Sequence, residues 1–163
     1  MPKTGQTTCY DTSGNVIDCA NTGQDGDKQA GVAWPSPRFT DNGNGTVTDN
    51  LTGLVWLKNA NCFGEKTWTE ALNAANTLQH GQCGLSDNST AWQWRLPNVN
   101  ELESLLHAWQ SDTASWLNAQ GFSNAQSDWY WSSTTYADYT ARAWKMWNGN
   151  VNYGTKGSSS YVW

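Results

Sequence analysis

The chain carries few side chains of the kinds that catalyse reactions, and they do not stand at catalytic spacings. Its two histidines, His80 and His107, have no partner at a motif spacing. The sequence contains no G-x-S-x-G, no H-E-x-x-H and no glycine-rich phosphate loop. Acidic pairs such as Glu101/Glu103 lie two residues apart, a spacing that is common in loops and on helix faces. We therefore expect no enzymatic activity.

The four cysteines, Cys9, Cys19, Cys62 and Cys83, could form disulfides or hold a metal ion. Four cysteines allow three pairings. The run CYDTSGNVIDC predicts a hairpin with Ser13-Gly14-Asn15 as its turn, in which Cys9 faces Cys19. This favours a Cys9–Cys19 disulfide, and with it Cys62–Cys83. Four free thiols or a zinc site are the alternatives, although no C-x-x-C is present.

Paired cysteines bear on where the protein works. Disulfides persist in oxidising compartments, so we expect an exported protein at the cell surface or outside the cell. The first residues, Met1-Pro2-Lys3, do not begin a signal peptide. We therefore expect the export signal to lie outside this sequence.

The loop DNGNGTVTD, which starts at Asp41, could be taken for a calcium loop. An EF-hand needs oxygen-bearing side chains at its third and fifth positions, where this chain has Gly43 and Gly45. The loop is better interpreted as the turn of a hairpin. The run QDGD, with Asp25 and Asp27, is a weaker candidate. We expect no cofactor and no metal site, with calcium as the alternative left open.

The last 35 residues, 129–163, are typical of a contact surface. They hold five of the twelve Trp and five of the six Tyr, together with many Ser, Asn, Gly and Thr. Antibody combining sites have this composition, because rigid amphipathic rings supply contact area and small polar residues supply hydrogen bonds. The segment has a net charge of +2 and the remainder −7. The predicted ligand-binding residues are Tyr139, Arg142, Lys145, Trp147, Tyr153 and Thr155. Trp at alternate strand positions, such as Trp129 and Trp131, could instead belong to the core.

These residues must be positioned by short strands and two helices. Residues 38–56 predict three strands around the turns DNGNG and NLTG. A capping box of Thr67 and Glu70 begins a helix that ends near Gly81, and Asn98 with Glu101 begins a second. Trp68 and Trp109 lie on the apolar stripes of these helices, and we expect Glu101, Glu103 and His107 on the solvated side.

The C-terminal part returns to strands. WYWSSTTY predicts one strand, ARAWKMWNGNVNY a hairpin that turns at Asn148-Gly149, and YVW a last short strand. Strands, two helices and then strands indicate an α+β fold with an antiparallel sheet.

Length and charge exclude several classes of protein. A chain of 163 residues is expected to be one domain, with residues 1–37 as a disulfide hairpin and loop extension of a 38–163 module. A net charge of −5 argues against nucleic acid as a partner. No run of 18 apolar residues exists, so no membrane insertion is expected.

Five ordered motifs resemble a known family. FTDNGNGTVTDNLTGLVWLKNANCFG, TWTEALNAAN, WRLPNVNELESLL, YWSSTTYA and NGNVN are similar to the Lcl C-terminal domain family, the C-terminal module of bacterial collagen-like adhesins. The resemblance runs from Phe39 to Trp163. It implies an exported domain with a C-type-lectin-like fold; in the adhesin, the domain is trimeric and binds sulfated glycosaminoglycans.

Two departures limit what the resemblance implies for ligands. Sulfated glycans need clustered Lys and Arg, of which this acidic chain has only nine, so we do not carry that ligand over. The runs LPN at Leu96–Asn98 and WNG at Trp147–Gly149 replace the E-P-N and W-N-D of calcium-dependent lectins. Sugar binding through calcium is therefore not implied.

Domains of this fold are also similar to the variable proteins of diversity-generating retroelements. Those proteins display randomised residues on a lectin-like scaffold. The less patterned positions between Tyr136 and Tyr161 fit such a surface; they are Asp138, Tyr139, Ala141, Arg142, Lys145, Trp147, Tyr153, Thr155 and Gly157.

Three hypotheses follow for the function. The first is a non-enzymatic recognition domain of an adhesin or receptor that binds a protein or glycan through its C-terminal hairpin. The second is a structural subunit whose Trp-rich faces assemble into a homotrimer or a surface filament. The third is an enzyme related to formylglycine-generating enzymes, which are similar in fold but would need reactive cysteines.

Overall fold

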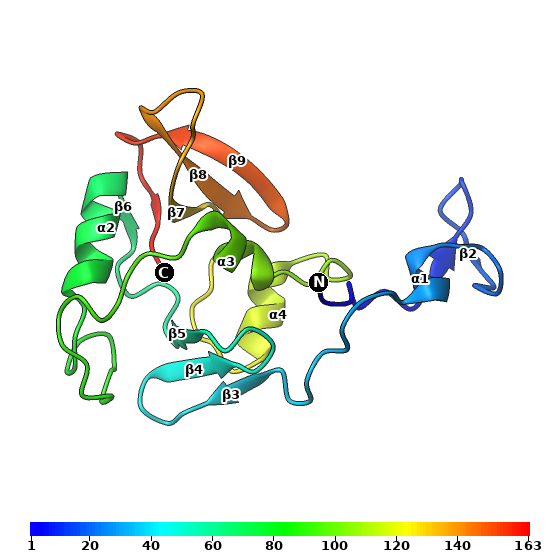
Figure 1. The fold of residues 1–163 in the computed structure, drawn as a ribbon, viewed down its shortest axis with the longest axis horizontal. Helices are drawn as coiled ribbons and strands as arrows, with labels where there is room; N and C mark the ends of the chain where they lie inside the picture. Colours follow the sequence, from blue (N-terminus) through cyan, green and yellow to red (C-terminus); the bar gives the residue numbers. More distant parts are fainter.

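The computed structural model describes residues 1–163, which form two parts of unequal size (Figure 1). Residues 1–37, called the arm below, project from the remainder, called the body. The arm contains β1 (Cys9–Tyr10), β2 (Val16–Ile17) and the one-turn helix α1 (Asp25–Lys28). Its two ends meet, because the Lys3 N–H donates to the Val32 carbonyl and the Val32 N–H to the Met1 carbonyl, both at 3.0 Å.

The hairpin of the arm has a different register from the one predicted. Cys9 pairs with Ile17 and Tyr10 with Val16, so Cys9 does not face Cys19 directly. The loop closes instead over Thr12-Ser13-Gly14, because the Asp11 N–H donates to the Asn15 carbonyl at 3.0 Å and the Asp11 carboxylate accepts the N–H groups of Ser13 at 2.9 Å and Asn15 at 2.8 Å. The prediction of a turn at Ser13-Gly14-Asn15 is therefore wrong by one residue.

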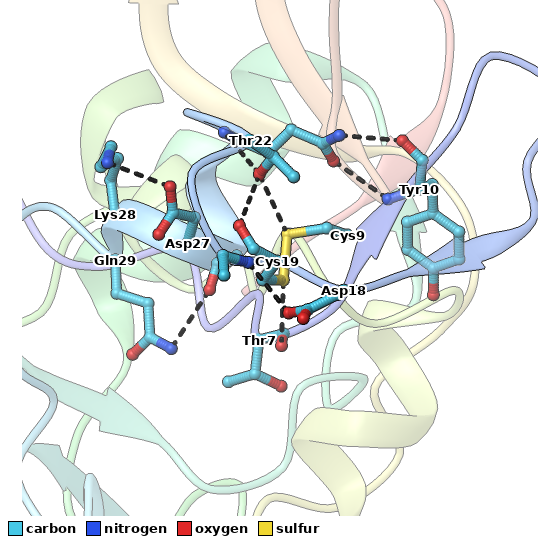
Figure 2. Close-up of a disulfide and its surroundings, with 12 residues drawn as sticks. Thr7, Cys9, Tyr10, Asp18, Cys19, Thr22, Asp27, Lys28 and Gln29 are labelled. Carbon is cyan, nitrogen blue, oxygen red and sulfur yellow. Dashed lines mark hydrogen bonds and ion pairs between the residues drawn. A yellow bond between two sulfur atoms is a disulfide. The ribbon is translucent and has the colours of Figure 1, made fainter.

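Both predicted disulfides are confirmed despite that shift. Cys9 and Cys19 are bonded with their Cα atoms 5.1 Å apart, and Cys62 and Cys83 with theirs 5.6 Å apart. No free cysteine remains. Figure 2 shows the first bond; beside it, the Thr22 hydroxyl donates to the Cys19 carbonyl at 2.9 Å.

The body begins with the predicted three-stranded antiparallel sheet. It consists of β3 (Phe39–Asp41), β4 (Thr46–Asp49) and β5 (Val55–Leu57), in that order. The DNGNG loop is the turn between β3 and β4, where Gly43 and Gly45 have φ of 71° and 86°. Glycine tolerates such angles because it has no Cβ. The loop is therefore the turn of a hairpin, as the sequence predicts.

A second sheet has five strands. Across it lie β6 (Glu65–Lys66), β10 (Ser160–Tyr161), β7 (Tyr130–Thr135), β8 (Arg142–Trp147) and β9 (Asn150–Thr155). The last strand of the chain, β10, lies between β6 and β7. It is antiparallel to β6 but parallel to β7, with Tyr161 opposite Tyr130. The expectation of a wholly antiparallel sheet is wrong at this pair.

The body has three helices instead of two. They are α2 (Trp68–Thr77), α3 (Val99–Ser104) and α4 (Thr113–Ala119). The capping boxes predicted for α2 and α3 are present. The seven-residue α4, which the sequence analysis missed, begins where the Asp112 carboxylate accepts the N–H groups of Ala114 and Ser115. No helix of the chain is both long and apolar enough to cross a membrane.

Two residues of the second predicted helix are placed differently from the prediction. Because α3 ends at Ser104, Trp109 leaves the stripe; it is 38% exposed and contacts Tyr10 of the arm, with ring centroids 5.7 Å apart. His107 is half-buried, not solvated: its ring lies edge-on to Trp34 at 4.6 Å and to Trp116 at 5.1 Å.

A buried ion pair ties the start of the body to its core. Arg38 is 5% exposed and Asp49 is fully buried, and the Arg38 Nη2 lies 3.2 Å from the Asp49 Oδ2. The Arg38 guanidinium also lies over the Trp34 ring at 4.3 Å. Buried charges need such a partner, since an unpaired one is strongly destabilising. The remaining core packs between the two sheets and the helices.

Candidate binding surface

The β8–β9 hairpin carries the predicted site, and its register decides which side chains share a face. Trp147 pairs with Asn150, and Trp144 with Tyr153. The predicted turn at Asn148-Gly149 is present, with φ of 45° and 85°. The Asn148 side chain fixes the turn to the start of α4, because its Oδ1 accepts the Thr113 N–H at 2.8 Å.

The six predicted residues do not form one surface. Successive side chains of a strand point to opposite faces of a sheet. Arg142 and its partner Thr155 therefore lie on one face with Tyr153, whereas Lys145 and Trp147 lie on the other. Tyr139, in the loop before β8, joins the first group, because the Arg142 guanidinium lies 5.2 Å from its ring.

The first face holds a compact group of aromatic rings around one guanidinium. Tyr136 and Tyr153 stack with ring centroids 4.5 Å apart and an interplanar angle of 7°. The Arg142 guanidinium lies 4.9 Å from the Tyr153 ring, and Trp144 packs edge-on against Tyr136 at 5.2 Å. We call Tyr136, Tyr139, Arg142 and Tyr153 the arginine–tyrosine cluster.

Two tyrosines of this cluster are exposed to solvent, and its arginine has no ion-pair partner. Tyr139 is 57% exposed and Tyr153 37%. None of the four ion pairs of the chain includes Arg142, so its planar fork of N–H donors remains available to a ligand. An arginine stacked on tyrosine rings keeps its charge while losing conformational freedom in advance of binding.

The loop from 136 to 142 is closed by its own hydrogen bonds. The Tyr136 N–H donates to the Arg142 carbonyl at 3.0 Å, and the Arg142 N–H to the Tyr139 carbonyl at 2.9 Å. The Tyr136 hydroxyl donates to Asp138 at 3.2 Å, which raises the pKa of that phenol. These hydrogen bonds fix the loop that carries Tyr136 and Tyr139.

The opposite face carries a lysine among tryptophans. The Lys145 ammonium lies 5.0 Å from the Trp129 ring and 5.7 Å from the Trp131 ring. Partial burial there lowers the pKa of Lys145. Trp147 packs on Trp129 with centroids 5.7 Å apart, and its Nε1 donates to the Ser127 hydroxyl at 3.4 Å. Trp131 is fully buried, so this face is partly core.

Sequence reasoning missed two members of these groups, Tyr136 and Trp129. Both precede the hairpin, and Trp129 was weighed as core. Arg142 and Lys145 are three residues apart on one strand, so their side chains point to opposite faces of the sheet. Counting back from the turn at Asn148-Gly149 gives this separation from the sequence alone. The contact with Tyr136 depends on the loop closure and was not readable from spacing.

No group of three or more His, Cys, Asp or Glu side chains in residues 1–163 is arranged so that it could hold a metal ion. Asp25 and Asp27, the weaker calcium candidate, lie on α1. The Asp27 carboxylate is engaged by Lys28 at 3.0 Å and by the Gly23 N–H at 3.0 Å.

Comparison with known families identifies the domain that contains the two faces of the β8–β9 hairpin. The model of the Lcl C-terminal domain family matches residues 45–163. The chain belongs to the Lcl C-terminal domain family. No curated protein and no solved structure matches it. The matched residues of this Lcl C-terminal domain include the whole β8–β9 hairpin and both of its faces, whereas the arm lies outside the match.

Proposed function

We propose that this Lcl C-terminal domain is a non-enzymatic recognition module of an exported, adhesin-like surface protein, and that it binds its ligand through the arginine–tyrosine cluster. The observation that carries the proposal is the stacked Tyr136–Tyr153 pair with an unpaired Arg142 beside it. Such a surface offers apolar area and directed donors at little cost in conformational entropy. The ligand class is a protein or glycan surface group with exposed acceptor oxygens.

The chain's other properties support this placement. Two disulfides suit an oxidising, extracellular setting. The mixed α+β arrangement with a C-terminal hairpin suits a C-type-lectin-like scaffold, which we propose as its fold. None of the nine positions proposed as variable is buried, which is compatible with a diversified surface. Sequences of sibling chains from one genome test whether that segment is diversified: clustering of differences between Tyr136 and Tyr161 supports it, and an even spread contradicts it.

The binding test uses two pairs of substitutions on the same hairpin. Arg142→Ala with Tyr153→Ala removes the cluster, and Lys145→Ala with Trp147→Ala, on the opposite face, is the matched control. Binding is first located on glycan and protein arrays and then measured by surface plasmon resonance. We expect the first pair to weaken binding by about 100-fold or more, since one hot-spot residue is worth at least about 2 kcal/mol and neighbouring residues do not add fully, and the second by less than about fivefold. The reverse ranking would place the site on the Lys145 face.

Self-assembly is the competing hypothesis, and light scattering on the purified protein distinguishes it. A monomer that binds a ligand through the cluster supports recognition. A stable oligomer that Arg142→Ala with Tyr153→Ala dissociates would show that the cluster is a subunit interface.

A further inference from the structure

One edge of the five-stranded sheet is uncovered. β9 lies at the end of the strand order and pairs only with β8, so its outer side has no neighbouring strand (Figure 1). Its six residues include no proline and no charged side chain, and its ladder with β8 has no bulge. The opposite edge, β6, is only two residues long, and both residues are charged. Proteins normally protect an edge strand by shortness, charge, proline or a bulge, so β9 is open to another strand and β6 is not.

The register of the β8–β9 hairpin shows which backbone groups of β9 face outward. Trp147 and Asn150 flank the two-residue turn as a hydrogen-bonded pair, and from there every second residue of β9 faces β8. The other residues point their N–H and C=O groups out of the sheet, and they are Val151, Tyr153 and Thr155. Arg142 agrees with this pattern, because its N–H donates to the Tyr139 carbonyl and not to its partner Thr155.

Most of these outward groups have no partner within the chain. Of the three N–H groups, only that of Tyr153 is bonded, and it donates to the side-chain Oδ1 of Asn152 at 2.8 Å. Of the three carbonyls, that of Thr155 accepts the Ser158 N–H at 2.9 Å. The remaining donors and acceptors can pair with an added strand, whose carbonyl would replace the Asn152 side chain at Tyr153.

Both cations of the hairpin lie over this edge strand, one on each face. The Arg142 guanidinium lies 4.9 Å from the Tyr153 ring. On the other face, Lys145 lies over Gly154: a Cβ added to this glycine would be 3.0 Å from the Lys145 Cε and 3.2 Å from its Nζ. Neither cation has an ion-pair partner. The open edge is therefore flanked by unpaired positive charge.

This charge limits what can occupy the edge. A second copy of the chain would bring its own Arg142 and Lys145 beside the first pair and no acidic residue on β9, so like charges would meet. A glycan has no row of backbone donors and acceptors to match the edge. An extended peptide with acidic side chains supplies both, since the fork of an arginine holds a carboxylate by two parallel hydrogen bonds.

We propose that the partner of this domain is an extended acidic segment of another protein, which adds to the sheet as a strand beside β9 and places a carboxylate on Arg142. This segment is the ligand of the recognition module proposed above, so the inference rests on that function. The backbone of β9 supplies sequence-independent hydrogen bonds, and Arg142 with the stacked tyrosines selects the side chains.

The test uses the peptide acetyl-TVEVEVT-amide and ¹⁵N-labelled protein followed by NMR. We expect binding with a Kd on the order of 1 mM or tighter. At saturation, the N–H groups of Val151, Tyr153 and Thr155 should exchange with solvent at least about fivefold more slowly, because they enter a hydrogen-bonded ladder. Those of Asn152 and Gly154, which already face β8, should change little. This alternation distinguishes strand addition from contact through side chains alone.

Two further peptides test the chemistry of the partner. Acetyl-TVQVQVT-amide keeps the shape of the first peptide without its charge, and it should bind about fivefold more weakly. Arg142→Gln should remove most of this difference. Acetyl-TVEPEVT-amide has a central proline that removes a ladder hydrogen bond, and it should bind at least about tenfold more weakly.

A substitution on the edge itself gives an independent test. Thr155→Pro removes an outward N–H and leaves the hydrogen bonds to β8 in place. Thr155→Val keeps the N–H and the branched shape, and it is the matched control. Thr155→Pro should bind the acidic peptide at least about fivefold more weakly than Thr155→Val. Unchanged indole N–H signals would show that both variants are folded.

Each of four results would overturn the proposal. They are no slowing of exchange in the alternating pattern, equal affinity for the acidic and the neutral peptide, equal affinity of the two Thr155 variants, and a dimer of the free protein in which the same three N–H groups are already protected. The last result would assign the edge to a second copy. If a ligand from the arrays binds through Arg142 and Tyr153 while exchange along β9 stays the same, the proposed recognition stands and strand addition is wrong.

Discussion

At the residue scale, His107 couples the arm to the body. Its ring lies between Trp34 of the arm and Trp116 of α4. Its Nδ1 accepts the Trp109 N–H at 3.3 Å, which requires an unprotonated Nδ1. Burial first, and the nearby Arg38 charge second, lower the pKa of His107 below its usual 6.5. Asp49 is the only carboxylate paired with Arg38, and it offsets part of that charge.

The sign of the resulting pH dependence follows from the lowered pKa. The unfolded state binds a proton at His107 more readily than the folded state, so the stabilisation is complete above pH 6.5 and is lost as the pH falls toward the folded pKa. We expect the free energy of unfolding to decrease between pH 7 and pH 5, and His107→Gln to flatten this slope. Urea denaturation at several pH values measures it. His80→Gln, at an exposed position, is the control; equal slopes for both variants would contradict the assignment.

At the element scale, the arm lies on the body through a close backbone approach. A Cβ added to Gly5 would lie 2.3 Å from the His107 Cε1, and Gly5 has a φ of 85°. Gly5→Ala should therefore loosen the arm and leave the body folded. Gly14 in the arm hairpin has a similar φ of 82° but nothing within 4 Å, so Gly14→Ala carries the backbone strain without the clash.

Hydrogen exchange of the Val32 N–H measures the closure of the base of the arm next to Gly5, because this N–H donates to the Met1 carbonyl. We expect Gly5→Ala to accelerate its exchange by about tenfold or more, equivalent to the roughly 1–3 kcal/mol of strain at such sites. Gly14→Ala should leave it near the wild-type rate. Similar rates for the two variants would show that the Gly5 contact does not hold the base of the arm closed.

The elements that were predicted correctly from the sequence are those specified by residues close together in the chain. The capping boxes at Thr67 and Asn98 begin α2 and α3, and Asn148-Gly149 turns the β8–β9 hairpin. Each signal needs only residues within a few positions of one another. The prediction of Cys9–Cys19 was correct although its register was wrong, because the cysteines remain close after the shift.

The errors come from contacts between distant parts of the chain. The second helix was expected to extend to Trp109, but His107 leaves the helix to pack between Trp34 and Trp116. The stack of Tyr136 on Tyr153 likewise joins the loop between β7 and β8 to β9. Hydrophobic pattern and residue propensity do not predict contacts between distant residues. These contacts determine both where α3 ends and which residues form the candidate site.

At the scale of the whole molecule, the two disulfides should act on different parts. Cys62–Cys83 lies in the body and closes 21 residues around α2, whereas Cys9–Cys19 closes 10 residues within the arm. Replacing Cys62 and Cys83 by Ala should lower the free energy of unfolding of the body by about 3 kcal/mol. The same change at Cys9 and Cys19 should leave it within about 0.5 kcal/mol of the wild type.

Tryptophan fluorescence during urea denaturation reports the unfolding of the body, since only one of the twelve tryptophans, Trp34, lies in the arm. If both double variants lose the same free energy of unfolding, the arm and the body unfold as one cooperative unit. That result would also remove the basis for treating the arm as a separate part of the fold.

The position of β10 sets the order in which the molecule can be assembled. β6 and β7 do not pair with each other; both pair with β10, which follows every other strand in the chain. While the ribosome is still making residues 67–159, the five-stranded sheet therefore lacks an inner strand, and Trp163, which is 8% exposed in the finished fold, has not yet been added to the core. The five-stranded sheet can therefore close only after β10 has been synthesised, because until then no strand lies between β6 and β7.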